Sequence, residues 1–587
     1  MLNARITVPT PQNEPVLNYA PGSQEKDTLK AQLQRFSDDQ IEIPLIIGGH
    51  DVTTGDLGKC VLPHDHHKVI ATYHKGNTET VNQAIAAAAA AREQWASMPW
   101  EARASIFLKA AELLAGKYRP VINAATMLNQ SKTVLQAEID AACELIDFWR
   151  FNASYLPEIY EQQPASAPGI WNYVEYRPLE GFVFAVTPFN FTSIAGNLPT
   201  SPALMGNTVI WKPASTAVYA AYWLMQLLKE AGLPDGVINM VPGSGGQIGE
   251  PAMNHPDLGG VHFTGSTEVF QGMWQTVGAN IATYKSYPRI VGETGGKDFI
   301  FAHASTDPDE LVTALVRGAY EYQGQKCSAA SRAYIPQSIW NTHGDQLCQQ
   351  VDSITYGDVC DFTNFMGAVI DRASYSSLRG HIETAQADAD AEVICGGDCD
   401  DRTGFFVAPT IIQTRNPHYK TMETELFGPV LTVYVYADNA YEDTLDLCNT
   451  TSPYALTGAI FARDRQAINL ASDTLRHAAG NFYINDKPTG AVVGQQPFGG
   501  SRASGTNDKA GSYLNLTRWV STRTTKENFI PPTDYRYPHM DEKYTQSVQN
   551  YTVRDVECET ERRGDKNGTL IPVEPLPETQ ELKRTGA

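Results

Sequence analysis

The feature that most limits the possible folds is a regular alternation of short apolar segments and helical stretches between residues 181 and 290. The apolar segments predict strands at residues 181–186, 208–211, 237–241 and 260–263, with helices at about 216–231, 246–252 and 267–279. Strands and helices that alternate at these lengths are typical of a parallel, doubly wound α/β sheet. Such a sheet binds its ligands beyond the carboxyl ends of the strands. A similar alternation from about 299 to 480 predicts a second α/β domain.

The segments around these two domains have other patterns. Residues 1–40 are polar and contain prolines, which predicts an N-terminal arm lying on the surface. Helices are expected across residues 78–118 and from about 135 to 151, and an alternating strand at 171–176. Residues 529–587 are rich in prolines and charges without an apolar period, which predicts an extended C-terminal tail.

Composition excludes several classes of function. The 587 residues carry a net charge of −21 and no basic cluster, which argues against nucleic-acid binding. No apolar run approaches the ~18 residues of a membrane span. The nine cysteines are scattered and form no CxxC pair, which favours a reducing compartment over a disulfide or zinc scaffold. His64-Asp65-His66-His67 follows Pro63 and predicts a solvated loop, so no metal is expected.

The first residues are polar and soon acidic, without the apolar region of a secretory signal. This pattern favours the bacterial cytoplasm, with the mitochondrial matrix as the alternative.

Cys327 and Glu293 are the candidates for covalent catalysis. Cys327 is framed by Gly324 and Lys326, and Glu293 lies upstream between glycines. A thiolate can attack an electrophilic carbon, after which a separate base activates water to release the acyl group. Taken singly, a cysteine is more often a small buried apolar residue, and a glutamate in a glycine-rich turn is more often a surface carboxylate.

Two glycine-containing turns are candidates for a dinucleotide site. Residues 243–249 depart from the dinucleotide fingerprint at Ile248, so a simple strand-to-helix turn explains them equally well. Gly265 and Ser266 close the fourth strand and open a helix, whose first N–H groups can hold a pyrophosphate. Lys212 ends the second strand, where a ribose or phosphate would lie.

Six motifs, in this order and spacing over roughly residues 40–525, resemble the aldehyde dehydrogenase superfamily. They are Pro188-Phe189-Asn190-Phe191, Trp211-Lys212-Pro213, Phe263-Thr264-Gly265-Ser266-Thr267, Glu293-Thr294-Gly295-Gly296-Lys297, Gly324-Gln325-Lys326-Cys327 and Glu425-Leu426-Phe427-Gly428-Pro429. The resemblance implies a Rossmann-type NAD-binding domain (41–160 and 181–291), an α/β catalytic domain (292–487) and a small β oligomerisation flap (161–180 and 510–528). It also implies a homodimer acting on a small-molecule substrate.

The resemblance further implies roles for single residues. Cys327 would be the nucleophile that forms a thiohemiacetal and then a thioester, Asn190 and the Cys327 N–H would hold the oxyanion, and Glu293 would activate water. The residues implied to contact NAD are Thr187, Lys212, Gly265, Ser266, Thr267, Glu268, Val269, Glu425 and Phe427. Ser215 lacks a carboxylate that would repel a 2′-phosphate, so the preference for NAD over NADP is expected to be incomplete.

Residues 482–487, 493–500 and 502–509 resemble those superfamily members that oxidise L-glutamate γ-semialdehyde, which is in equilibrium with Δ1-pyrroline-5-carboxylate, to L-glutamate in the second step of proline degradation. The implied substrate contacts are Ser328, Gly490 and Ala491 for the α-carboxylate, Phe191 and Phe498 for the aliphatic chain, and Glu144 for the ammonium. The resemblance implies a serine at the position of Ala491, so weaker binding of the carboxylate is expected here. A plain carboxylate on a helix surface is an equal alternative for Glu144.

Three other functions compete with this hypothesis. The chain could be an NAD(P)-dependent dehydrogenase of another semialdehyde. A CoA-acylating dehydrogenase is disfavoured because Glu293 is present as a deacylating base. A catalytically silent scaffold is disfavoured because Cys327, Glu293 and Asn190 are all intact.

Overall fold

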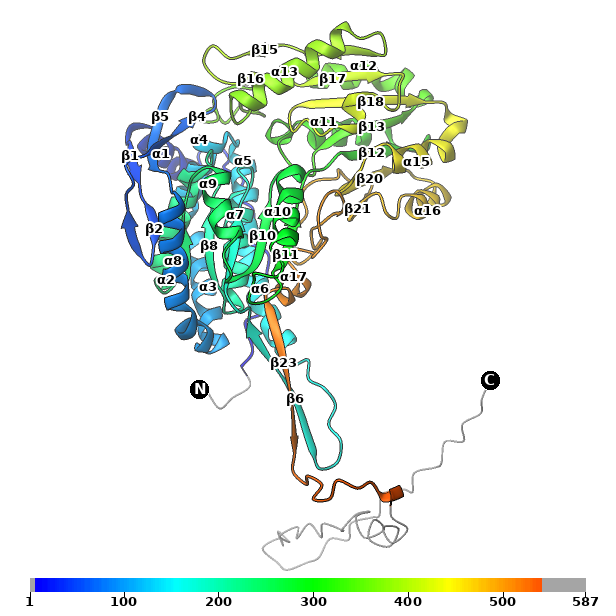
Figure 1. Ribbon diagram of the computed structural model, residues 1–587. Coiled ribbons are helices and arrows are strands. Elements are labelled where there is room, and N and C mark those ends of the chain that lie inside the picture. Colours follow the sequence, from blue (N-terminus) through cyan, green and yellow to red (C-terminus); the bar gives the residue numbers. More distant parts are fainter. Residues whose placement is uncertain (1–5, 541–587) are drawn as a thin grey trace, which may run out of the picture. The chain divides into compact units, whose positions relative to one another are not determined.

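The computed structural model describes residues 6–540 (Figure 1). The described residues fall into two units, one of residues 6–164 and 173–525, the other of residues 165–172 and 526–540. Both large sheets and the candidate site belong to the first unit. The tail expected at 529–587 lies outside the described residues from residue 541 onward.

The first large sheet has seven strands in the order β11-β10-β7-β8-β9-β2-β3. The strands from β11 to β9 are parallel, whereas β2 and β3 add an antiparallel edge. The four strands expected between residues 181 and 263 are therefore confirmed. The bounds are β2 Leu45–Ile47, β3 His50–Val52, β7 Phe182–Val186, β8 Thr208–Lys212, β9 Ile238–Met240, β10 Leu258–Thr264 and β11 Arg289–Glu293.

Both faces of this sheet are covered, because the residues of its central strands β7, β8, β9 and β10 are buried at nearly every position. Side chains alternate across a strand, so Phe182 and Phe184 enter one core and Val183 and Ala185 enter the other. The core on the first face includes α2 Thr78–Ser97, α9 Gly245–Met253 and α10 Thr267–Ala279. The opposite core includes α3 Trp100–Ala115, α4 Arg119–Gln130, α6 Glu144–Tyr160, α7 Thr192–Leu204 and α8 Val218–Ala231.

The second large sheet, which confirms the second α/β domain, has the order β14-β17-β18-β13-β12-β20-β21, with only β14 antiparallel. Phe299 and Phe301 of β12 pack with α13, α15 and α16, while Ile300 packs with α11 and α12 on the other face. The strands are β12 Asp298–Ala302, β13 Ala330–Pro336, β14 Ala391–Cys395, β17 Thr410–Thr414, β18 Val430–Tyr436, β20 Thr457–Phe461 and β21 Asn481–Ile484. The helices are α11 Pro308–Tyr320, α12 Gln337–Asp352, α13 Arg372–Ala387, α15 Tyr441–Thr450 and α16 Arg465–Thr474.

Four small sheets complete the β structure. The strand expected at 171–176 is confirmed as β6 Ile170–Pro178, which pairs with β23 Val520–Asn528 in a two-stranded ribbon (Figure 1). The other strands are β1 Ile41–Ile43, β4 Leu57–Leu62, β5 Asp65–His74, β15 Cys399–Asp400, β16 Phe406–Val407, β19 Tyr454–Ala455 and β22 Ser501–Arg502. The remaining helical turns are α5 Val134–Ala137, η1 Glu138–Cys143, η2 Glu321–Gly324, α14 Lys420–Glu423, η3 Asp438–Ala440, α17 Tyr513–Thr517 and η4 Pro538–Met540.

Within the segment expected as an N-terminal arm, residues 1–40, the structure forms a helix that the sequence analysis did not predict, α1, Gln24–Asp38. This helix buries Leu29, Leu33 and Phe36, whose spacing of four and three residues puts them on one face. Ser23 caps its N-terminus by accepting a hydrogen bond from the Lys26 N–H. The mainly polar composition of the segment hid this narrow apolar stripe.

Two smaller expectations need correction. The histidine-rich segment is not a solvated loop: it leads into β5, and His64 is buried with its Nε2 3.1 Å from an Asp358 oxygen. The helix expected at 135–151 is interrupted by the π-helical turn η1, Glu138–Cys143, directly before α6. In the part of the chain that is described, no helix is long and apolar enough to cross a membrane.

Candidate active site

The carboxyl edge of the first sheet gathers several of the candidate residues. Asn190 lies between β7 and α7, Lys212 ends β8, Ser266 follows β10, and Glu293 ends β11. Because these strands are parallel, their carboxyl ends meet at one edge. Cys327 comes from the second domain, between η2 and β13.

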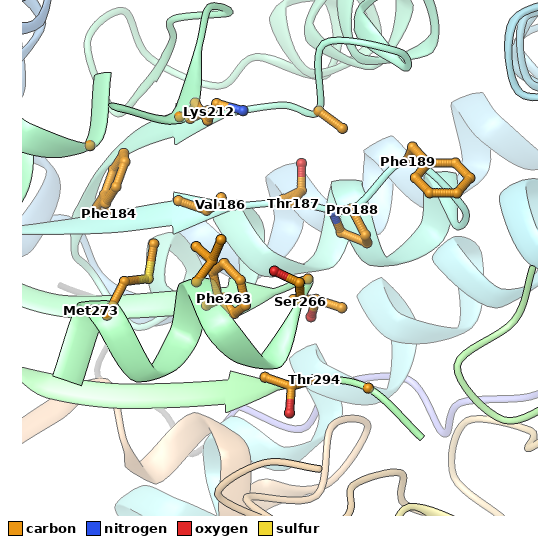
Figure 2. Close-up of a pocket in the computed structure, with 18 of the residues that line it drawn as sticks. Phe184, Val186, Thr187, Pro188, Phe189, Lys212, Phe263, Ser266, Met273 and Thr294 are labelled. Atoms are coloured by element: carbon orange, nitrogen blue, oxygen red, sulfur yellow. The ribbon is translucent and has the colours of Figure 1, made fainter. Parts of the chain in front are cut away.

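A cavity of about 850 Å³ opens at this edge. Figure 2 shows Thr187, Lys212 and Ser266 around it. Of the expected cofactor contacts, those that line it are Thr187, Lys212, Gly265, Ser266, Val269, Glu425 and Phe427, together with Asn190 and Cys327. Thr267 and Glu268 are not among the lining residues: the Thr267 hydroxyl donates to the Ala503 carbonyl, and Glu268 is exposed to solvent.

The cavity has features that fit a dinucleotide. Ser266 has the backbone conformation of an N-cap, but its side chain makes no capping hydrogen bond, so the first N–H groups of α10 stay available for an anion. Gly246 and Gly272 line the cavity, and a Cβ added at either would meet nothing within 4 Å. The chain therefore leaves this space to a ligand. Burial lowers the pKa of Lys212 to about 8.

Glu425 and Phe427 mark the end of the cavity nearest the second domain. Glu425 Oε1 accepts a hydrogen bond of 2.9 Å from the Gly296 N–H, and burial raises the pKa of this carboxyl to about 7. Phe427 has a φ of 57°, which is unfavourable for a bulky residue, and its ring lies 5.8 Å from that of Phe189 at an edge-on angle. A strained residue of this kind persists where the surrounding structure holds it, as often occurs at functional sites.

Cys327 and Glu293 are brought together as the sequence predicted. The Cys327 thiol donates to Glu293 Oε1 across 3.6 Å. Burial and the neighbouring Glu293 charge raise the pKa of the thiol well above its ordinary value, so it is protonated at rest. Burial also raises the pKa of Glu293 to about 7, while the Cys327 hydrogen bond and the Lys509 charge oppose that rise. Glu293 can therefore both accept and release a proton near neutral pH.

Lys326, which frames the cysteine in the sequence, does not face it. Its Nζ lies 3.1 Å from Asp140 Oδ2, and Lys132 Nζ lies 2.5 Å from the same oxygen. This buried group of charges was missed by sequence reasoning, because Lys132 and Asp140 are far from Lys326 in the chain. The base beside the thiol is Glu293, not a lysine.

The oxyanion donors are available at the nucleophile. Asn190 is buried and its Nδ2 donates to the Gln325 carbonyl at 3.0 Å, which orients the amide and leaves its second N–H free. Within residues 6–540, the backbone N–H of Cys327 has no hydrogen-bond acceptor. Asn190 and Cys327 line the same cavity, where two such donors can stabilise a developing oxyanion.

The turn that presents Cys327 is strained and tightly held. Tyr322, Gln323 and Gly324 all have positive φ values, of 52°, 51° and 64°. The Gln323 side chain donates to the carbonyls of Ser131 and Ala368 at 3.0 and 2.8 Å. These buried hydrogen bonds fix the approach to the nucleophile, a role that no motif in the sequence had indicated.

The expected substrate residues are only partly gathered. The Ser328 hydroxyl donates to Thr489 Oγ1 at 2.8 Å, which links the nucleophile segment to the loop that begins with Gly490 and Ala491. Phe498 lines a small cavity of about 30 Å³ that also contains Glu293. Phe191 is buried, with Lys132 Nζ 4.3 Å from its ring centre. Gly490, Ala491, Phe191 and Glu144 do not line the 850 Å³ cavity.

Glu144 is not a plain surface carboxylate. It opens α6 directly after the π-helical turn and accepts a hydrogen bond from the Ser193 hydroxyl. Burial and the Asp140 charge raise the pKa of Glu144 to about 8, although Ser193, Lys132 and Lys326 oppose the rise.

Comparisons with known proteins agree with this geometry. Residues 53–525 match the model of the aldehyde dehydrogenase family, and the chain belongs to that family. It is 56% identical over 540 residues to a mitochondrial Δ1-pyrroline-5-carboxylate dehydrogenase of Dictyostelium discoideum, covering 92% of this chain and 97% of the relative. The human mitochondrial Δ1-pyrroline-5-carboxylate dehydrogenase is 46% identical over 529 residues, covering 90% and 94% of the two chains.

A solved structure gives the same relationship. The Δ-pyrroline-5-carboxylate dehydrogenase of Mycobacterium tuberculosis, bound with NAD, superposes with a TM-score of 0.89 at 55% identity. The match covers 92% of this chain and 100% of the other.

Proposed function

We propose that this chain is an NAD-dependent Δ1-pyrroline-5-carboxylate dehydrogenase, which oxidises L-glutamate γ-semialdehyde to L-glutamate. The observation that carries the proposal is the 3.6 Å approach of the Cys327 thiol to Glu293 beside a cavity that fits a dinucleotide. The relatives described above carry this name, and the chain matches them over nearly their whole length.

In the first half of the reaction, Glu293 takes the thiol proton as Sγ attacks the aldehyde carbon. Asn190 Nδ2 and the Cys327 N–H hold the resulting oxyanion of the thiohemiacetal. Bound NAD supplies the acceptor for the hydride that leaves this carbon. The sulfur then carries a thioester, and Glu293 must lose its proton before the next step.

In the second half, the ionised Glu293 removes a proton from water as the water attacks the thioester. The C–S bond breaks, the acid leaves, and the sulfur returns to the thiol. One aldehyde, one NAD and one water thus give one carboxylic acid, one NADH and one proton. The raised pKa of Glu293, about 7, suits a group that both gains and loses a proton in each turnover.

For the amino-acid end of the substrate, we assign the α-carboxylate to the N–H groups of Gly490 and Ala491 and to the Ser328 hydroxyl, which would turn from Thr489 to donate to it. Gly490 has a φ of 97°, a conformation that few other residues adopt, and this turns the loop sharply beside Thr489. We assign the ammonium to Glu144: within residues 6–540, Lys132 and Lys326 are both paired with Asp140 and form no ion pair with Glu144, and a bound ammonium would favour the ionised form of this carboxyl.

The competing function is oxidation of a different semialdehyde. Initial rates of NADH formation with glutamate semialdehyde and with succinate semialdehyde separate the two. We expect a much higher kcat/KM for glutamate semialdehyde, because succinate semialdehyde lacks the ammonium group. An equal or higher value for succinate semialdehyde would reject the proposal.

We further propose a homodimer. The ribbon of β6 and β23 has only two strands, and such a ribbon is at best marginally stable alone. Pairing with a second copy would complete it. Light scattering of the eluting protein is expected to give twice the chain mass of 64.4 kDa, and a monomer would refute the assembly.

The bacterial cytoplasm stays our prediction for the compartment, with the mitochondrial matrix as the alternative. The eight cysteines within the described residues are all free, as expected for a reducing environment. Fractionation of source cells distinguishes the two compartments.

A further inference from the structure

Asn13, in the segment before α1, connects two parts of the protein that flank the proposed substrate site. Its Nδ2 donates to Asp147 Oδ2 at 2.8 Å and to the Val493 carbonyl at 2.8 Å. Its Oδ1 accepts from Gln495 Nε2 at 2.9 Å. One half-buried side chain thus bonds to α6 on one side and to the loop after residue 490 on the other.

These two partners carry the groups that we assign to substrate recognition. Asp147 lies on α6 three residues after Glu144, which is one turn along the same helix. Val493 and Gln495 follow Gly490 and Ala491 in the same loop. Asn13 therefore sets the position of the carboxylate-binding loop relative to the helix that carries the ammonium-binding group.

The position of Asn13 is itself fixed by its neighbours along the chain. The Glu14 N–H donates to Asp147 Oδ1 at 2.7 Å, and the Glu14 carboxylate accepts from Arg150 at 2.8 Å. The Leu17 N–H and the Tyr19 hydroxyl donate to the two oxygens of Glu138 at 2.9 and 2.7 Å. The segment is thus held at several points against the π-helical turn and α6, so Asn13 does not move freely with the loop.

Thr489, directly before the loop, accepts a hydrogen bond of 2.8 Å from Ser328, but among the described residues the stretch 490–496 has few other bonds of this kind. Gln496 Oε1 accepts from the Val492 N–H at 2.9 Å, but that bond lies within the loop. Gly494 lies against Phe151 of α6 so closely that a Cβ would come within 2.1 Å of the ring. This packing holds the loop near α6 without a directional bond, whereas Asn13 supplies three bonds with defined directions.

We propose that Asn13 is a positioning residue for the amino-acid end of the substrate. By joining Asp147 to Val493 and Gln495, it holds the loop of Gly490 and Ala491 at the separation from Glu144 that an α-amino acid requires. The N-terminal segment is thereby part of substrate selection although it lies far from the nucleophile in the sequence. The inference rests on the proposed assignment of the carboxylate and the ammonium.

The test compares Asn13→Ala with Asn18→Ala in the full chain. Asn18 belongs to the same segment, but its side chain accepts from the Ala20 N–H within the segment itself, so it is the matched control. Initial rates are measured with glutamate semialdehyde, with propanal and with NAD as the varied reactant. Propanal reaches the same nucleophile but has neither a carboxylate nor an ammonium group.

Asn13→Ala is expected to raise the KM for glutamate semialdehyde about tenfold, the effect of losing one to two net hydrogen bonds. The kcat, the KM for propanal and the KM for NAD are expected to stay within about twofold of the wild type, as are all values for Asn18→Ala. A variant that keeps the amide, Asn13→Gln, is expected to recover part of the affinity. Gln495→Ala removes one of the three bonds and is expected to give a smaller rise in the same direction, which keeps the test decisive if Asn13→Ala fails to fold.

Two kinds of failure can be told apart. If the wild type has no preference for glutamate semialdehyde over propanal, the proposed function is wrong and the role of Asn13 falls with it. If the wild type has that preference but the Asn13 and Gln495 variants keep it, or lose affinity equally for both aldehydes, the role of Asn13 is overturned while the proposed function stands.

Discussion

The steady-state rate is expected to depend on pH through Glu293. The chemistry assigned to this residue requires the ionised form when water attacks the thioester. Because burial raises its pKa to about 7, activity should be lost as the pH falls through that value and should be complete above it.

The size of the expected loss of activity at low pH follows from the raised pKa of Glu293. With a pKa of about 7, roughly a tenth of Glu293 is ionised at pH 6 and roughly nine tenths at pH 8, so kcat should fall nearly tenfold between these values. A glutamate with the ordinary pKa of 4.5 would be almost fully ionised at both pH 6 and pH 8, and kcat would hardly change between them.

Stopped-flow measurement of NADH formation separates hydride transfer from thioester hydrolysis. Replacing the base with Glu293→Gln is expected to leave a burst of about one NADH per active site, followed by a steady rate at least about 100-fold slower than that of the wild type. The burst should accelerate with rising pH, because the thiol must then ionise without its base. A flat profile between pH 6 and 8 in the wild type, or a normal steady rate in the variant, would refute the assignment.

Three further predictions follow from the structure. Cys327→Ala is expected to abolish turnover and to retain NAD binding by calorimetry, since most of the cofactor cavity is formed by other segments; measurable turnover would exclude this nucleophile. Ala491→Ser is expected to lower the KM for glutamate semialdehyde modestly without affecting propanal, because a hydrogen bond to a charged group contributes at most about 1.5–3 kcal/mol and the Ser328 hydroxyl already supplies part of it; equal effects on both aldehydes would show that the loop does not bind the carboxylate. Arg119→Met is expected to lower the free energy of unfolding by about 3–5 kcal/mol in urea, since Glu138 would stay buried without its cation; a loss below about 1 kcal/mol would contradict this.

Much of the fold could be predicted because the strands are buried on both faces. The apolar runs at β7, β8 and β10 are visible without any alignment, and the helices between them have ordinary lengths. The antiparallel β2 and β3 were not foreseen, since strands of three residues leave almost no periodic signal. The helix α1 was missed for a related reason, as only Leu29, Leu33 and Phe36 interrupt its polar sequence.

The residues of the candidate site could be predicted where they lie within a sequence motif. They could not be predicted where a side chain is held by residues far away in the sequence. Cys327, Glu293 and Asn190 lie within recognisable motifs, and the structure gathers them. The direction of the Lys326 side chain depends on Asp140, and the bonds of Asn13 depend on Asp147 and Val493. Such pairings arise only when the chain folds, so neighbouring residues in the sequence give no sign of them.

The most direct test of the proposed function is the intact mass of Glu293→Gln after mixing with glutamate semialdehyde and NAD. The stalled thioester predicts an increase equal to one γ-glutamyl group, located on Cys327 by peptide mapping. The increase should be absent in the double variant that also carries Cys327→Ala. An unmodified protein after a full burst of NADH, or the acyl group on another residue, would contradict covalent catalysis by Cys327.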